Sequence, residues 1–268
     1  MRFAAAFAVS AALLGTLTAC NDDAANGSQD IGGTATPSQA VQLDPKAALA
    51  ASAAVMQKAG NSKIVLSEQG KTISTGSVGW QDKSSFELVS ADTNVVRGIG
   101  EAIYMSVPKA QQASAAGKHW VKVDQSNENG RQNAVAFLTF EQMTNPVVQL
   151  SVAAASGQLT KVGTESVSGA ETVHYKSVQQ AATMVAAMTG LSADQRKSVL
   201  KGLEASGLTA TSEFWINAKQ ELVQSKVFGD KQDVTTTFVY SGLGTAPKIE
   251  APAASDTLGW ADGEKLVG

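Results

Sequence analysis

The chain of 268 residues contains one cysteine, Cys20. A single cysteine cannot close a disulfide within the chain, so the fold must be held together by buried apolar side chains. Hydrophobic residues make up 43% of the chain and charged residues 17%, a composition typical of a globular protein. A domain of this length buries roughly 70–75% of the surface of its unfolded chain, which allows a sizeable core.

The first 19 residues have the layout of a secretory signal peptide. Arg2 supplies a positive start, residues 3–14 form an apolar run interrupted only by Ser10, and small residues follow. The run is too short to serve as a permanent membrane anchor. We therefore expect residues 1–19 to direct export and to be removed.

The sequence LTAC at Leu17–Cys20 resembles the lipobox of bacterial lipoproteins. In that group the cysteine sulfur receives a diacylglyceryl group, with acyl chains such as palmitate, and the peptide is cut just before it. The resemblance implies an extracytoplasmic protein held at the outer face of the cell membrane by a lipidated Cys20. The alternative is an inert cysteine in an ordinary signal peptide.

Composition divides the rest of the chain into three parts. Residues 20–43 are polar and rich in Gly, Ser, Thr and Asp, which indicates a flexible tether behind the lipidated cysteine. Residues 44–250 show no internal boundary and are predicted to form one domain of the α+β class. Residues 251–268 are predicted to be a C-terminal tail of low order.

Capping residues mark several helices within the domain. Asp44 and Pro45 suit the start of a helix that Gly60 ends, and Asn145 and Pro146 begin another that closes at Gly157. A helix is expected near 178–188, and a capping box at Ser192–Gln195 opens one more.

Short segments with a period of two, separated by turn residues, predict antiparallel strands between these helices. The segments are 63–68, 85–90, 94–97, 102–107, 119–123, 159–167, 171–177, 208–217, 222–229 and 234–240.

Groups that would carry chemistry are scarce. The two histidines, His119 and His174, each stand in a strand-like segment with no second ligand at metal spacing. No nucleophile elbow, Walker loop or dinucleotide fingerprint is present. The net charge of −3 and the lack of a basic patch argue against a nucleic-acid partner. We expect a protein that is not an enzyme and needs no cofactor or metal.

The expected helices carry mostly Ala, Val and Met on their inward faces, as in AALAASAAVM and QQAATMVAAM. A sheet covered by such helices either draws the backbones close together or leaves an apolar cavity. Met184 and Met188 suit a cavity, because methionine adapts to irregular apolar shapes.

Several longer stretches resemble the LppX/LprAFG-type lipoproteins of actinobacteria. The stretches are the N-P-x-x-x-L helix at Asn145–Leu150, VSGAETVHYK, ATSEFWINAKQELVQSKVFG and TTTFVYSGLGTAPKIEAPAAS. The resemblance covers most of residues 44–255. It implies a single antiparallel half-barrel sheet with helices packed across its concave face, related to the LolA/LolB lipoprotein carriers.

The same resemblance implies a function in the cell envelope. Members of the family hold an acylated lipid or glycolipid between helices and sheet and carry it within the envelope. For this chain we expect such a lipid as ligand, with an envelope transporter or another protein as a candidate partner. We expect the cavity wall to include Val148, Val152, Met184, Val185, Met188, Leu200 and Leu203. Each could equally be an ordinary core residue. The alternative function is an interaction or regulatory surface lipoprotein with a filled core.

Overall fold

The computed structural model describes residues 43–81, 83–124, 127–204, 207–230 and 235–267. The predicted signal peptide, Cys20 and the tether lie outside the described residues, apart from residue 43. Within the described part, twelve strands form one open sheet and six α-helices accompany it.

The sheet consists of two meanders joined at one seam. Its order is β12-β6-β5-β4-β3-β2-β1-β11-β10-β9-β8-β7, and all neighbours are antiparallel except β12 and β6. The strands are β1 (Asn61–Glu68), β2 (Lys71–Gly79), β3 (Ser85–Ser90), β4 (Val95–Ile99), β5 (Ala102–Ser106), β6 (Trp120–Val123), β7 (Gln158–Val167), β8 (Ala170–Gln180), β9 (Thr209–Asn217), β10 (Leu222–Gly229), β11 (Thr235–Ser241) and β12 (Thr257–Leu258).

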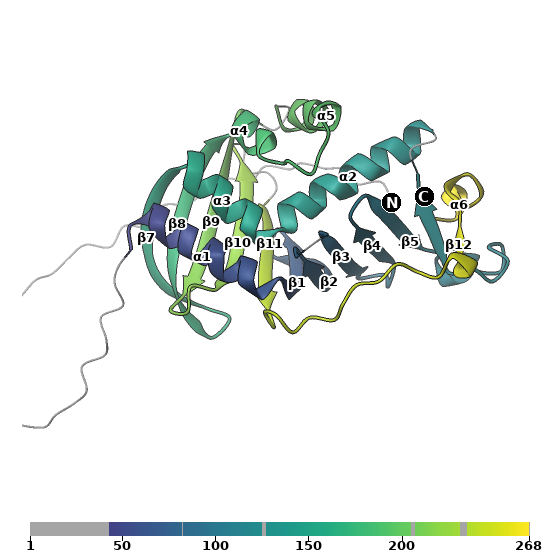
Figure 1. The fold of residues 1–268 in the computed structure, drawn as a ribbon, viewed down its shortest axis with the longest axis horizontal. Coiled ribbons are helices and arrows are strands. Elements are labelled where there is room, and N and C mark those ends of the chain that lie inside the picture. The colour runs from purple at the N-terminus through teal and green to yellow at the C-terminus, as the bar shows by residue number, and fades with distance from the viewer. Residues whose placement is uncertain (1–42, 82, 125–126, 205–206, 231–234, 268) are drawn as a thin grey trace, which may run out of the picture.

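Helices cover one face of this curved sheet. Figure 1 shows α1, α3 and α2 lying across it, with α4 and α5 along one side of them. The predicted α+β half-barrel is confirmed. The helices are α1 (Pro45–Ala59), α2 (Glu128–Thr144), α3 (Pro146–Ser156), α4 (Ala181–Ala186), α5 (Ala193–Glu204) and α6 (Trp260–Val267), with short 3₁₀ turns at Lys109–Gln111 and Ala254–Asp256.

The predicted caps form as expected. The Asp44 carboxylate accepts hydrogen bonds from the backbone N–H groups of Lys46 and Ala47, at 3.0 and 3.1 Å. Gly60 ends α1 at φ +75°, a left-handed conformation that favours glycine. In the capping box before α5, the Ser192 N–H donates to Gln195 Oε1 at 2.7 Å, and the Gln195 N–H donates to Ser192 Oγ at 3.2 Å.

The small residues of α1 and α3 pack these two helices closely together. Ala48 and Ala53 of α1 are 2% and 8% exposed, and Leu150 and Ala153 of α3 are fully buried. Larger side chains fill the space against the sheet, where Phe86, Phe214 and Phe238 are completely buried. Of the two outcomes open to the alanine-rich helices, α1 and α3 therefore take close packing.

Before the C-terminal segment, three elements differ from the sequence-based expectation. β2 and α2 were not predicted, because KTISTGSVG is too polar and ENGRQNAVAF too rich in Asn and Gly to give a clear period. The helix expected near 178–188 is shorter. β8 continues to Gln180, and α4 occupies only Ala181–Ala186.

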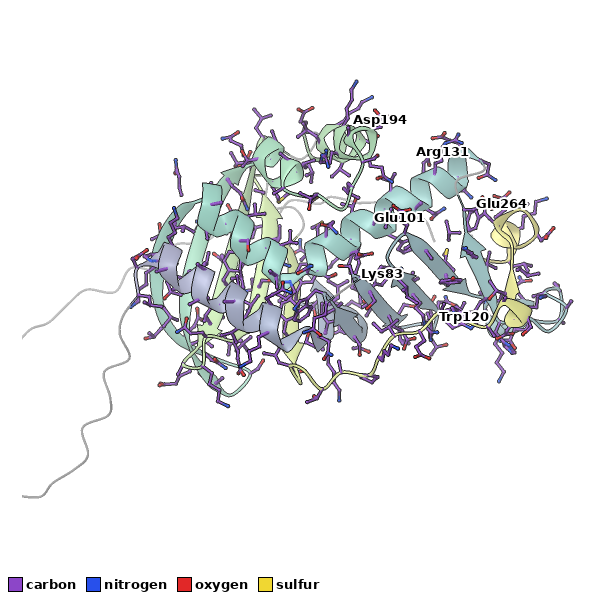
Figure 2. All side chains as sticks on the ribbon, in the orientation of Figure 1. Lys83, Glu101, Trp120, Arg131, Asp194 and Glu264 are labelled. Carbon is purple, nitrogen blue, oxygen red and sulfur yellow. The ribbon has the colours of Figure 1, made fainter. Side chains whose placement is uncertain are left out.

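The C-terminal segment is the main correction. Residues 251–268 were expected to be a tail of low order, but β12 pairs with β6 and α6 packs beside it. Trp260 is 1% exposed, and its indole N–H donates to Asn127 Oδ1 at 3.1 Å. The prediction failed because one buried tryptophan, rather than a periodic apolar pattern, holds the segment in place. Figure 2 labels Trp120 and Glu264 at this end of the sheet.

Candidate functional site

A small cavity lies between the sheet and the helices that cover the β8–β10 half. Its volume is about 30 Å³. It is lined by residues of α3 and α4, of the C-terminal end of α2, of the turn after α4, and of three strands. The lining residues are Gln142, Met143, Val148, Gln149, Val152, Gln179, Met184, Met188, Ser212 and Val227.

Four of the predicted wall residues converge on this cavity. Val148 and Val152 come from α3, Met184 from α4, and Met188 from the turn that follows α4. Together they form an apolar roof over the strands. These residues lie far apart in the sequence, and the covering of β8–β10 by α3 and α4 brings them together.

The other three predicted residues lie elsewhere. Val185 is buried on α4, at 3% exposure, and does not line the cavity among the described residues. Leu203 of α5 lines a separate groove, which is described below. Leu200 of α5 is half-buried and, among the described residues, lines neither the cavity nor that groove.

The cavity wall is more polar than the sequence suggested. Gln142, Gln149 and Gln179 contribute amide side chains, and Ser212 adds a hydroxyl. Gln179 follows Tyr175 and Ser177 at alternate positions of β8, which places all three on the same face of the sheet. Sequence analysis missed Gln179 because it placed residues from 178 onward in a helix. A continued period of two through 179 was the signal that could have found it.

Buried hydrogen bonds fix the junction of α2 and α3 beside the cavity. The Tyr240 hydroxyl of β11 donates to the Thr144 carbonyl at 3.0 Å. Gln149 Nε2 donates to the Tyr240 oxygen at 3.2 Å and also to the Met143 carbonyl. Burial raises the pKa of the Tyr240 hydroxyl well above its usual range, so it stays a donor at every physiological pH.

A wider groove separates α2 from α5. Its volume is about 750 Å³, and its lining combines apolar side chains with a polar rim. Figure 2 shows Arg131 on α2 and Asp194 on α5, which both belong to this lining. The apolar part consists of Val135, Ala136, Val199 and Leu203. Since α4 borders the cavity and packs against α5, which borders the groove, one helix pair adjoins both spaces.

Glu141 is a carboxyl on the buried stripe of α2, two turns after Ala134 and one after Leu138. It is 6% exposed, and its Oε2 atom has no hydrogen-bond partner among the described residues. Burial raises the pKa of Glu141 to about 7, and a hydrogen bond with Ser84 acts in the opposite direction. Glu141 is not among the described residues that line the cavity.

Each of the two histidines pairs with a carboxylate. His119 Nδ1 lies 2.7 Å from Asp256 Oδ1, and this hydrogen bond lowers the pKa of the Asp256 carboxyl. His174 Nδ1 lies 3.0 Å from Glu165 Oε1. In the described ranges, no group of three or more His, Cys, Asp or Glu side chains is arranged to hold a metal ion.

No known family profile matches the chain. An uncharacterised 31.2 kDa protein of Streptomyces griseus, from the rplA–rplJ intergenic region, is 27% identical over 232 residues. The match covers 76% of this chain and 76% of that protein.

The fold is similar to solved structures of bacterial lipoproteins. LppX of Mycobacterium tuberculosis is 12% identical with a TM-score of 0.48, covering 77% of this chain and all of that one. LprF of Mycobacterium bovis is 13% identical with a TM-score of 0.48, and the match covers 78% of this chain and 97% of LprF. A LolA-superfamily protein of Nitrosomonas europaea is 8% identical with a TM-score of 0.28, covering 80% and 96%. LppX and LprF are of the LppX/LprAFG type that the sequence motifs resemble, and the LolA superfamily is the wider group that this resemblance implied.

None of the helices in the described part of the chain combines the length and the hydropathy that crossing a bilayer requires.

Proposed function

We propose that this protein is an exported lipoprotein that binds an acylated lipid between the helices and the sheet and carries or presents it within the cell envelope. One observation carries the proposal. The apolar roof of Val148, Val152, Met184 and Met188 covers a cavity on the helix-covered face of the sheet. No catalytic group is needed for such a function.

The cavity must enlarge to accept a lipid. Its 30 Å³ holds about one water molecule, whereas sites for small ligands measure roughly 300–1,000 Å³. The groove between α2 and α5, at about 750 Å³, falls within that range. We infer that displacement of the α4–α5 pair joins the two spaces, and that the flexible side chains of Met184 and Met188 adapt to the incoming chain.

The driving force is removal of acyl chains from water. Each CH₂ group that leaves water contributes about 0.8 kcal/mol. Transfer from a bilayer gains much less, because the chain is already in an apolar medium. Reversible opening therefore suits a carrier better than tight binding does.

Lipid extraction from the purified full-length chain, followed by mass spectrometry, tests the proposal. We expect an acylated lipid at about one per chain. Val152→Trp fills the cavity and should remove most of the bound lipid. Val162→Trp should leave the lipid content unchanged, because Val162 is 53% exposed on β7. A lipid-free chain that also fails to bind added acyl lipid would favour the alternative, an interaction module with a filled core.

The membrane anchor is the second part of the proposal. We propose that Cys20 carries the acyl chains and holds the protein at the outer face of the membrane, with residues 20–43 as the tether. Its support is the LTAC motif behind an apolar segment. Cys20→Ser should abolish incorporation of labelled palmitate and release the protein from membranes. Retention of the label in Cys20→Ser would contradict the assignment.

A further inference from the structure

The amide of Gln149 has only one reasonable orientation. Its Nε2 atom carries two hydrogens, and they are directed to the Met143 carbonyl and the Tyr240 oxygen. The Tyr240 hydroxyl already donates to the Thr144 carbonyl, so its oxygen is free to accept. Rotating the amide by 180° would set its oxygen against the Met143 carbonyl oxygen. Gln149 Oε1 is therefore a fixed acceptor.

This acceptor lacks a donor. Gln149 Oε1 is buried, and no described residue donates a hydrogen bond to it. Gln149 itself lines the cavity under α3 and α4. An acceptor that is buried without a donor is destabilising, since it has lost its hydrogen bonds to water.

Gln179 supplies a second buried amide oxygen without a donor. The residue is 5% exposed and lines the same cavity, and its Oε1 has no hydrogen-bond partner in the described part of the chain. Ser212 lines the cavity from β9, where it pairs with Ser177 of β8. The Ser177 hydroxyl is also buried without a partner among the described residues. Gln179 and Ser212 thus place polar groups on the strand side of the cavity, and Gln149 places one on its helix side.

We propose that the lipid bound here carries a free hydroxyl next to its acyl chains, and that this hydroxyl donates to Gln149 Oε1 or Gln179 Oε1. This inference rests on the proposed function and narrows the class of ligand. A fully esterified lipid offers only acceptor oxygens, which would face the two amide oxygens without a shared hydrogen. A diacylglycerol-like lipid satisfies an acceptor and still places its acyl chains under Val152, Met184 and Met188.

A pair of ligands that differ only in the hydroxyl tests the inference. The probe is a fluorescent fatty acid bound to the full-length chain carrying Cys20→Ser, so that no lipid is attached covalently. The competitors are 1,2-dioleoylglycerol and its 3-O-methyl ether. We expect dioleoylglycerol to displace the probe at a concentration about tenfold lower than the ether does, the effect of one buried hydrogen bond.

Variants locate the preference. Gln179→Met should reduce the preference for dioleoylglycerol over its ether to about twofold. Binding of the ether should stay unchanged, because the methionine thioether fills the same space without an acceptor oxygen. Gln149→Met should act in the same direction, and thermal unfolding of both variants shows whether they fold. Gln111→Met is the matched control, since Gln111 is exposed on a 3₁₀ turn and does not line the cavity.

The outcomes separate the two proposals. Equal displacement by dioleoylglycerol and its ether overturns the inference and leaves the carrier function intact. Such a result would mean that a trapped water satisfies the two amides. Failure of the probe and of both competitors to bind overturns the carrier function itself. A tenfold preference that survives both Gln149→Met and Gln179→Met would also overturn the inference, because the hydroxyl would then be recognised elsewhere.

Discussion

The imidazole of His174 on β8 lies flat against the indole of Trp215 on β9, with ring centroids 4.2 Å apart and planes 16° apart. Trp215 is on the sheet face opposite Phe214, yet it is only 3% exposed. Its indole N–H donates to Glu165 Oε1 at 2.6 Å, and Lys226 Nζ lies 4.8 Å from the ring centre. Polar side chains thus shield a tryptophan on the face without the long helices.

Removing this stack should weaken the fold. His174→Ala exposes the Trp215 ring and should lower the free energy of unfolding by about 1 kcal/mol, with a red shift of tryptophan emission. Urea denaturation followed by fluorescence measures both. His119→Ala serves as the control, because the His119 side chain is 54% exposed. Equal losses in the two variants would show that the stack contributes nothing specific.

The buried carboxyl of Glu141 should make stability depend on pH. Its pKa of about 7 lies above the ordinary value of 4.5, so the folded protein binds more protons than the unfolded chain between these values. Stability is then highest below pH 4.5 as far as Glu141 is concerned, and falls as pH rises through 7. The full loss amounts to about 3 kcal/mol.

Glu141→Gln should remove this dependence. Denaturation between pH 5 and 8 should show a flatter profile for the variant, which becomes more stable than the parent above pH 7. Glu101→Gln, at an exposed position, should leave the profile unchanged. A parent protein whose stability does not fall between pH 5 and 8 would contradict the assigned environment of Glu141.

The Tyr240 hydroxyl should contribute to stability through the α2–α3 junction. Tyr240→Phe leaves the Thr144 carbonyl without its buried donor and should cost about 1–3 kcal/mol in chemical denaturation. In Tyr104→Phe a similarly buried ring, at 9% exposure, loses a hydroxyl that makes no hydrogen bond within the described residues. A near-neutral Tyr104→Phe beside a costly Tyr240→Phe is the expected pattern, and the reverse order would refute it.

Two helix glycines should respond to alanine in opposite ways. A Cβ at Gly130 of α2 would lie 2.0 Å from the Asp124 carbonyl oxygen and 2.9 Å from the Trp260 indole nitrogen. We expect Gly130→Ala to destabilise by about 2 kcal/mol, as backbone must shift. Gly202 of α5 has no atom within 4 Å of such a Cβ. Gly202→Ala should therefore stabilise by up to about 1 kcal/mol through helix propensity. Melting temperatures distinguish the two signs.

Local signals in the sequence predicted much of the fold. Asp44, Asn145 and Ser192 each cap a helix where expected, because an N-cap depends on only three or four neighbouring residues. α2 and β12 depend instead on distant partners. Asn127, which caps α2, also holds Trp260 and Glu264 from the other end of the chain. No window of sequence contains that arrangement.

The candidate site was predictable in its apolar half only. Val148, Val152, Met184 and Met188 stood out as apolar residues on helices, and the structure brings them to one cavity. The glutamines could not be identified in the same way, since Gln149 and Gln179 look like surface residues in a sequence. Gln179 is buried because α3 and α4 pack on β8, and the Gln149 Oε1 atom is buried where its amide meets Tyr240 of β11.

The order of the strands has a consequence for how this chain reaches its native state. Among the strands that the structure describes, only the β1–β11 and β12–β6 pairs join strands that are not consecutive in the chain. The other pairs link successive strands, most of them through short turns, whereas the β8–β9 connection contains α4 and α5. Most of each meander can therefore form from local hairpins at low loop-closure entropy. We expect the pairing of β1 with β11 and of β12 with β6 to form late and to limit the rate of folding. Residues 257–267 would then dock on a sheet that is already largely assembled.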